Sequence, residues 1–239
     1  MAVTFYKPII ANVACVGIYM ETQSLDIIKI AVTGGAGSGK TFVCNRLKEL
    51  GLNVVSSDTV ARETVAKNSP AYNRIVNHFG EKVLLSDGNL NRQALRRIII
   101  NDDAERLALE KIIHPDISKK MMQKVHQAQE AGDAVIVLEI PLLFELGMEG
   151  HVDTVVVISA DPELRTQRLM DRDSVDRNEA EKLIKAQMPD ELKVEQAHVV
   201  ITNNGSKKNL TKSVDTLYKN ILKMKKKDLK SLDSRKIMI

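Results

Sequence analysis

The sequence predicts an α/β fold in which five parallel strands form a doubly wound sheet flanked by helices. Short apolar runs rich in β-branched residues recur along the chain, as is typical of buried parallel strands; they span residues 27–33, 52–55, 134–138, 154–158 and 199–201. Helical patterns separate these runs, and a glycine-rich segment follows the first of them. Because ligands of such sheets bind beyond the carboxyl ends of the strands, we expect the functional site at that edge.

The first two runs belong to one βαβ unit. Val43, Leu47 and Leu50 recur at the spacing of one helix face, and Gly51 stands where a helix end favours a left-handed residue. The second strand follows at once. A connection of this kind is almost always right-handed, so we expect a right-handed crossover between these two strands.

A long helical stretch follows residue 58. Its patterns predict helices over residues 59–67, 71–79, 91–101, 104–113 and 115–131, with Pro115 in the first turn of the last helix, where proline is tolerated. We interpret this stretch as a helical insertion into the sheet domain. Further helices are predicted over residues 162–170, 178–186 and 207–222.

The composition excludes several classes of protein. Of the 239 residues 44% are hydrophobic and 28% are charged, which excludes a disordered or fibrous chain. The two cysteines, Cys15 and Cys44, form no pair at metal-ligand spacing, so we expect neither a disulfide framework nor a structural zinc site, and we expect a cytoplasmic location. Aromatic residues make up 3%, which argues against a single-strand binder that stacks bases.

Both ends of the chain differ from its centre. Residues 207–239 contain eleven Lys or Arg and three Asp, a balance of +8 that leaves −4 for residues 1–206 of a chain whose net charge is +4. We interpret the tail as a solvated, frayed helix end and expect no nucleic-acid partner. The apolar residues 9–20 are fewer than the roughly 20 that a membrane helix needs, so we expect a dispensable extension and no membrane partner, with a weak signal peptide as the alternative.

The glycine-rich segment is the most informative motif. Residues 34–41 match G-x-x-x-x-G-K-[ST] between a predicted strand and a predicted helix. Glycines let backbone N–H groups surround phosphate oxygens, Lys40 supplies a cation for the β- and γ-phosphates, and the Thr41 hydroxyl suits Mg²⁺. We therefore expect ATP and Mg²⁺ as cofactors. The expected nucleotide contacts come from Gly35, Ala36, Gly37, Ser38, Gly39, Lys40, Thr41 and Phe42.

Phe42 stands where many such loops carry a second hydroxyl, so we expect one minor contact to the α-phosphate to be missing. Asp58 follows the second strand, at the same edge of the sheet as the loop. A carboxylate there can position and deprotonate an attacking hydroxyl during phosphoryl transfer. It could equally N-cap a helix that starts at Thr59, and its position alone does not decide between the two roles.

Three other single residues also allow two interpretations. Glu139 ends the third strand as an outer partner of Mg²⁺ or as a strand cap. His114 is a packed residue or a ligand, and Asn203 is a turn residue or an amide that reads an adenine edge.

An arginine cluster follows the fourth strand. Arg165, Arg168 and Arg172 lie at i, i+3 and i+7, so a helix would place them on one face, and Arg177 comes soon after. Planar guanidinium groups suit a triphosphate. The intervening acidic residues also allow a salt-bridged surface with no such role.

Taken together, these segments resemble the dephospho-CoA kinase family. The resemblance covers about residues 27–222 and includes the glycine loop, the run into Asp58 followed by Ala61 and Arg62, F-G at 79–80, D-G-x-L-x-R at 87–92, I-H-P at 113–115, I-P-L-L-F-E at 140–145, R-D at 172–173, A-Q-M-P at 186–189 and N-N-G at 203–205. It implies a P-loop NTPase core at residues 27–58 and 133–222 with a small lid at about 165–190. Residues 59–132 become an acceptor-binding insertion, between an N-terminal extension (1–26) and a basic tail (223–239).

The resemblance also implies catalytic roles. Asp58 becomes the catalytic base, Lys40 and Thr41 the groups for phosphate and Mg²⁺, and Arg172 the cation of the lid. Ser56 departs from the acid that many members carry two residues before the base, so a magnesium site with two carboxylates at this strand end is not expected.

The implied reaction is the phosphorylation of the ribose 3′-hydroxyl of dephospho-CoA by ATP, which gives coenzyme A and ADP. Arg62, Arg92 and His114 become candidates for the acceptor site, and Asn203 becomes a contact on the adenine side. The alternatives are another P-loop kinase for nucleosides or nucleoside monophosphates and, from a different class, a regulatory GTPase or mechanical ATPase. A guanine-reading N-K-x-D motif is missing, which argues against a GTPase.

We expect deletion of residues 2–19 to leave turnover and the thermal midpoint unchanged, because this segment precedes the first predicted strand and carries no motif. The check is a steady-state assay and a melting curve of the truncated chain. An insoluble or inactive product would mean that the apolar run belongs to the core or to an interface.

Overall fold

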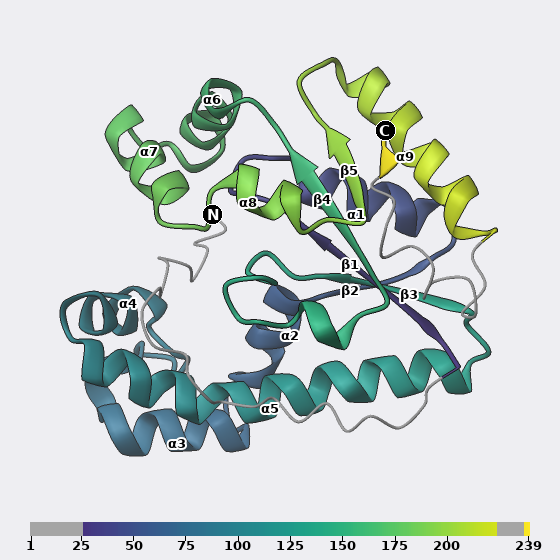
Figure 1. Ribbon diagram of the computed structural model, residues 1–239. Coiled ribbons are helices and arrows are strands. Elements are labelled where there is room, and N and C mark those ends of the chain that lie inside the picture. The colour runs from purple at the N-terminus through teal and green to yellow at the C-terminus, as the bar shows by residue number, and fades with distance from the viewer. Residues whose placement is uncertain (1–25, 224–236) are drawn as a thin grey trace.

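The computed structural model describes residues 26–223 and 237–239, which form a parallel sheet covered by helices on both faces (Figure 1). The strand order is β2-β3-β1-β4-β5-β6, and every pairing is parallel. The strands are β1 (Ile28–Thr33), β2 (Asn53–Ser56), β3 (Val135–Glu139), β4 (Thr154–Ser159), β5 (Val199–Thr202) and β6 (Ile237–Met238). The predicted α/β architecture is confirmed.

Alternating strand residues divide the core into two apolar layers. Ile30 and Val32 of β1 face one layer with helices α1 (Lys40–Glu49) and α9 (Lys207–Ile221). Ala31 between them faces the other layer, which contains helices α2 (Ser57–Thr64), α5 (Asp103–Glu130) and α8 (Asp190–Glu195). The central strand is therefore buried on both faces, as the unbroken apolar pattern of parallel strands requires.

A second, smaller core lies beside the sheet domain. It is formed by α3 (Pro70–Phe79), the short 3₁₀ helix η1 (Glu81–Val83), α4 (Arg92–Asn101) and the first half of α5, which pack in the lower left of Figure 1. Its buried residues are Ile75, Phe79, Val83, Leu95 and Leu109. These helices occupy the stretch that the sequence marks as an insertion.

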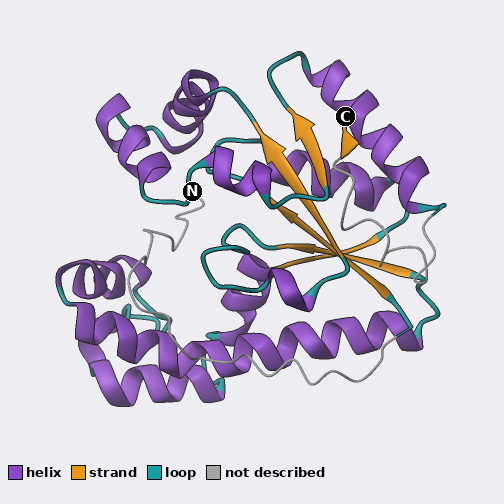
Figure 2. Ribbon diagram, viewed as in Figure 1, coloured by secondary structure: helices purple, strands orange, loops and turns teal. Residues whose placement is uncertain are grey.

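Two further helices project from the carboxyl edge of the sheet. These are α6 (Pro162–Asp173) and α7 (Arg177–Lys185), which contact each other in the upper left of Figure 2. The remaining short helix, η2 (Glu149–His151), precedes β4. Asp161 starts α6 by accepting hydrogen bonds from the backbone of Glu163 and Leu164, and this cap satisfies N–H groups that lack a helical partner.

The prediction of two helices separated at Pro115 is wrong. One continuous helix, α5, runs from Asp103 to Glu130 with the proline inside it. An internal proline removes a hydrogen bond and costs about 3 kcal/mol. The flanking turns offset this cost, because Leu109 is buried in the smaller core while Met121 and Val125 are buried against the sheet. Tertiary packing on both sides thus holds the helix through the proline.

The predicted count of five strands is also wrong, because the last residues of the chain add a sixth. Ile237 and Met238 pair with Val199 and Val200 of β5, and the side chains of Ile237 and Ile239 pack against the α1–α9 layer. The frayed helix end expected for the tail does not extend to these residues, and residues 224–236 lie outside the described part of the chain. Helix α8 was not predicted either, since six residues are too few for a helical period.

We expect Ile237→Ala combined with Ile239→Ala to lower the free energy of unfolding by about 1–3 kcal/mol, because two half-buried side chains lose apolar contacts. Chemical denaturation measures the loss. Met238→Ala is the matched control, since Met238 is 63% exposed and should change stability little. An equal loss in the control would show that side-chain packing at this strand contributes nothing.

Candidate active site

The glycine loop joins β1 to α1 at the carboxyl edge of the sheet. Gly39 is the N-cap residue of α1 with φ of +101°, a left-handed conformation that glycine adopts without strain. A Cβ at this position would lie 2.4 Å from Nδ2 of Asn203, so the close approach also requires glycine. The same Asn203 nitrogen donates a hydrogen bond to the Ser38 carbonyl (2.8 Å). The loop is therefore bonded to the residue that follows β5. It leads directly into the N-terminus of α1, and backbone N–H groups at such a helix start bind anions.

Lys40 is held over this loop. Its ammonium donates hydrogen bonds to the carbonyl oxygens of Gly34 (2.8 Å) and Gly35 (2.9 Å). Burial, together with the positive charges of Lys193 and Arg165, lowers its pKa to about 8, although Glu139 and Asp58 act in the opposite direction. The cation is thus poorly solvated, which strengthens its attraction to phosphate.

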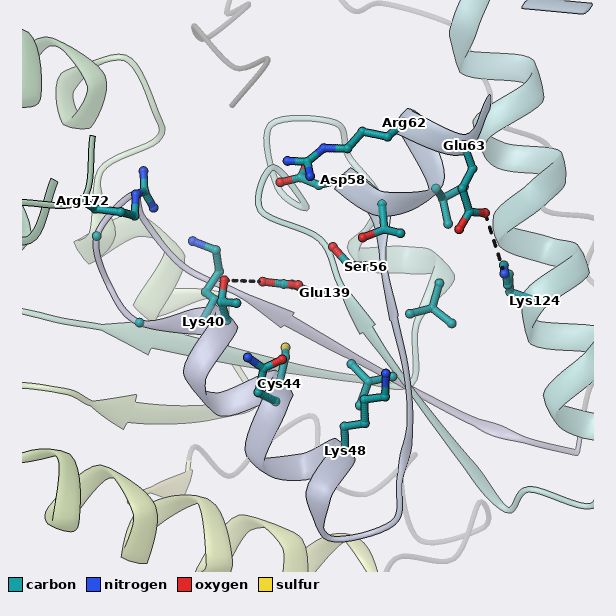
Figure 3. A pocket seen from close by; sticks show the side chains of 18 of the residues that line it. Lys40, Cys44, Lys48, Ser56, Asp58, Arg62, Glu63, Lys124, Glu139 and Arg172 are labelled. Atoms are coloured by element: carbon teal, nitrogen blue, oxygen red, sulfur yellow. Dashed lines mark hydrogen bonds and ion pairs between the residues drawn. The ribbon is translucent and has the colours of Figure 1, made fainter. Parts of the chain in front are cut away.

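A cavity of about 700 Å³ lies against the loop. Its walls come from the glycine loop, α1, the end of β2, α2, α5, the end of β3, and α6. Figure 3 shows Lys40, Asp58 and Glu139 facing the same space, with Arg172 on the lid side and Arg62 beside Asp58. Of the eight residues predicted to contact nucleotide, Gly37, Gly39, Lys40 and Thr41 line the cavity. Gly35, Ala36, Ser38 and Phe42 are not among the lining residues; Lys207 lies over the Phe42 ring instead, 5.3 Å from its centroid.

Asp58 is the second residue of α2, which starts at Ser57 with Ser56 as its N-cap residue. The alternative that Asp58 caps a helix beginning at Thr59 is therefore wrong. Burial raises the pKa of the Asp58 carboxyl and the negative charge of Glu139 raises it further, while Lys40 and Arg62 oppose this rise. A carboxylate with a raised pKa is a stronger proton acceptor.

Two oxygen atoms suited to Mg²⁺ lie beside Lys40. The Thr41 hydroxyl donates a hydrogen bond to Oε1 of Glu139 (3.2 Å), and both residues line the cavity. Mg²⁺ prefers oxygen ligands and is usually held by one or two carboxylates together with substrate phosphates. In the described part of the chain no group of three or more His, Cys, Asp or Glu side chains could hold a metal ion by itself. The donor set therefore fits an ion that arrives with the nucleotide.

The arginine cluster is divided by the structure. Arg168 and Arg172 line the cavity, and Arg172 pairs with its neighbour Asp173 through two hydrogen bonds of 2.7 and 2.6 Å. Arg165 is buried against the glycine loop, does not line the cavity and pairs with Asp190, so of the two interpretations the ion-paired one holds for this residue, although not at the surface. Arg177 lies outside the cavity and pairs with Glu163 and Glu181.

The three acceptor-site candidates lie in different places. Arg62 lines the main cavity. Arg92 starts α4, and both burial and the positive charge of the nearby Arg62 lower its pKa. His114 lines a separate pocket of about 50 Å³ between α2, α5 and the segment after β3, and burial lowers its pKa. The roles of all three stay predictions.

Sequence reasoning gave no individual role to three charged or polar residues around the loop. Gln187, Asp190 and Lys193 lie at or near α8, and Arg165, for which the sequence left two roles open, pairs with Asp190. A short helix without a clear period gives no signal for buried charges. Only the A-Q-M-P motif at residues 186–189 pointed to this region.

A phosphate-binding loop opposite a carboxylate, with two arginines of α6 lining the same cavity, meets the needs of phosphoryl transfer to a hydroxyl group, so the fold and the site define a P-loop kinase. A family model described as dephospho-CoA kinase matches residues 28–209. The dephospho-CoA kinase of Bacillus thuringiensis subsp. konkukian is 40% identical over 179 residues, which are 75% of this chain and 90% of that protein. The chain belongs to the dephospho-CoA kinase family, which confirms the resemblance seen in the motifs.

Two more relatives agree. The dephospho-CoA kinase of Moorella thermoacetica is 44% identical over 177 residues, which are 74% of this chain and 84% of that protein. The solved structure of dephospho-CoA kinase from Campylobacter jejuni has a TM-score of 0.63 at 26% identity, over 81% of this chain and 96% of that chain. Sequence and fold thus identify the same family.

We expect kcat/KM for ATP to have a bell-shaped pH profile. Lys40 must be protonated to attract phosphate, so activity falls as pH rises above about 8. Asp58 must be ionised, so activity falls as pH drops through a pKa above the ordinary range of Asp. Lys40→Arg is the control, because an arginine does not titrate in this range and the alkaline fall should vanish. An alkaline limb that persists in this variant would assign it to another group.

Proposed function

We propose that the protein transfers the γ-phosphoryl group of ATP to the ribose 3′-hydroxyl of dephospho-CoA, giving coenzyme A and ADP in the last step of coenzyme A biosynthesis. The observation that carries this proposal is the position of Asp58, which faces Lys40 across one cavity in a chain of the dephospho-CoA kinase family. The base and the phosphate-binding cation therefore lie on opposite sides of the space where acceptor and donor would meet.

In the proposed reaction Asp58 accepts the proton of the 3′-hydroxyl as its oxygen bonds to the γ-phosphorus, and the bond from that phosphorus to the oxygen bridging to ADP breaks. Lys40, Arg168 and Arg172 offset the negative charge that spreads over the phosphoryl oxygens. Thr41 and Glu139 would hold Mg²⁺, which would supply further neutralisation of the phosphate charge.

The acceptor is proposed to lie against the helices of residues 59–132. Arg62 brings a positive charge into the main cavity next to Asp58, and Arg92 lies close enough for Arg62 to lower its pKa. Two neighbouring guanidinium groups suit the diphosphate that dephospho-CoA carries and a nucleoside lacks. This is the feature that favours dephospho-CoA over the nucleoside alternative.

The proposed partners are small molecules, and the proposed location is the cytoplasm, on the sequence grounds already given. In the described residues no helix has both the length and the apolar character needed to cross a membrane. Asn203 is proposed on the adenine side of ATP because of the family resemblance, and its hydrogen bond to Ser38 shows that it contacts the loop.

The direct test offers the purified chain ATP, Mg²⁺ and a panel of hydroxyl acceptors. We expect ADP formation with dephospho-CoA and little with AMP or nucleosides. Equal turnover across the panel would contradict the assignment of the acceptor.

We expect Asp58→Asn to lower kcat about 10²- to 10⁴-fold, the usual contribution of a general base, with little change in the thermal midpoint. Glu139→Gln is the matched comparison, since it neutralises the other carboxylate of the same cavity. Its main effect should be a higher Mg²⁺ concentration for half-maximal activity. If Asp58→Asn turns over normally and Glu139→Gln does not, Glu139 is the base.

A further inference from the structure

Two ion pairs are buried next to the P-loop, outside the lining of the cavity. Arg165 Nη1 lies 2.8 Å from Asp190 Oδ1, and Lys193 Nζ lies 2.7 Å from Glu145 Oε1. The four side chains are between 0% and 10% exposed, and none of them lines the cavity. A buried ion pair is often no more stabilising than apolar residues of the same volume, so stability alone does not explain their presence.

The Arg165–Asp190 pair is in direct contact with the loop. Arg165 Nε donates a hydrogen bond to the Ala36 carbonyl (2.9 Å). A Cβ on Gly35 would lie 2.2 Å from Arg165 Nη2 and 2.6 Å from Asp190 Oδ1. The backbone of the loop thus lies against the ion pair, with no room for a side chain at Gly35. A displacement of the Arg165 guanidinium would therefore displace the loop.

Gln187 binds the other backbone group of Ala36, its N–H. The Ala36 N–H group donates to Oε1 of Gln187 (2.7 Å), so both backbone groups of Ala36 are bonded to the segments that form the lid and α8. The next residue along, Met188, donates its N–H to Glu145 (3.0 Å), which fixes this segment to the chain after β3.

Arg165 also sets the position of the lid helix. It shares α6 with Arg168 and Arg172, which line the cavity. Because Arg165 attaches this helix to the loop, Arg168 and Arg172 take fixed positions relative to the loop.

We propose that Arg165, held in place by Asp190, and Gln187 are positioning residues that keep the P-loop and lid helix α6 in the one geometry that binds a triphosphate. This inference deepens the proposed function and rests on it only for the identity of the nucleotide. Without the contacts to Ala36, the loop keeps its bonds to Lys40, Arg168 and Asn203, but the nucleotide must order Ala36 itself, and that cost weakens binding.

The test removes the pair without leaving an unpaired buried charge, by Arg165→Met together with Asp190→Asn. We expect the Kd for ATP with Mg²⁺, measured by calorimetry at pH 7 without acceptor, to rise about 10- to 100-fold. Amide hydrogen exchange at residues 35–38 should rise at least about 10-fold, because the loop opens more often. The KM for dephospho-CoA should stay within about 3-fold.

The matched control neutralises the other buried pair, by Lys193→Met together with Glu145→Gln. A glutamine at position 145 can still accept from the Met188 N–H group, and neither side chain of this pair makes a hydrogen bond to the loop. Lys193, like Arg165, lowers the pKa of Lys40, so this control reproduces the loss of a neighbouring cation while it keeps the contacts to Ala36. We expect its Kd for ATP to change less than that of the Arg165/Asp190 variant and the exchange at residues 35–38 to stay unchanged.

Gln187→Ala keeps the test decisive if the paired variant fails to fold, since Gln187 is half-buried and uncharged. It should raise the Kd for ATP about 3- to 10-fold, and less than additively with the Arg165/Asp190 change because both act on Ala36. Unchanged affinity and exchange in these variants, or an equal effect in the Lys193/Glu145 control, would overturn the inference. A wild-type chain that binds ATP but does not phosphorylate dephospho-CoA would contradict the proposed function alone.

Discussion

The site depends on one constraint, the parallel pairing of three neighbouring strands. Val32 of β1 and Ser56 of β2 both pair with Glu139 of β3, so three segments far apart in the sequence leave the sheet side by side. From these ends come the P-loop with Lys40, the helix start with Asp58, and Glu139 itself. A shift in register would separate Asp58 from the phosphate loop, so the buried apolar strands that fix the register also fix the positions of the site residues.

The surroundings of the loop destabilise the charged form of Lys40, and a bound anion would stabilise it. Burial and two neighbouring cations, Lys193 and Arg165, keep the pKa of Lys40 near 8. One pKa unit corresponds to about 1.4 kcal/mol of differential interaction between the protonation states. Phosphate oxygens next to Lys40 would stabilise its charged form, so binding of nucleotide and protonation of Lys40 favour each other.

The sequence was informative where local pattern and local chemistry coincide. The motif at residues 34–41 and the β-branched runs specify their structure over short stretches, and the strands and the loop were predicted from them. Pro115 was misjudged because its cost is offset by packing that involves residues distant in the chain. The strand at Ile237 and the partners of Arg165 depend on tertiary contacts alone, and the short helix with Asp190 has no period that could reveal them.

Helix α5 takes part in both cores of the protein. Its first half contributes Leu109 to the smaller core, and its second half contributes Met121, Val125 and Ala128 to the sheet layer. At 1.5 Å per residue, 28 residues extend over about 42 Å, so one rigid rod connects the two regions. Neither region can lose its packing without exposing half of this rod to water. The smaller core and the sheet are therefore expected to unfold cooperatively, and a tilt of one half of α5 displaces the other half.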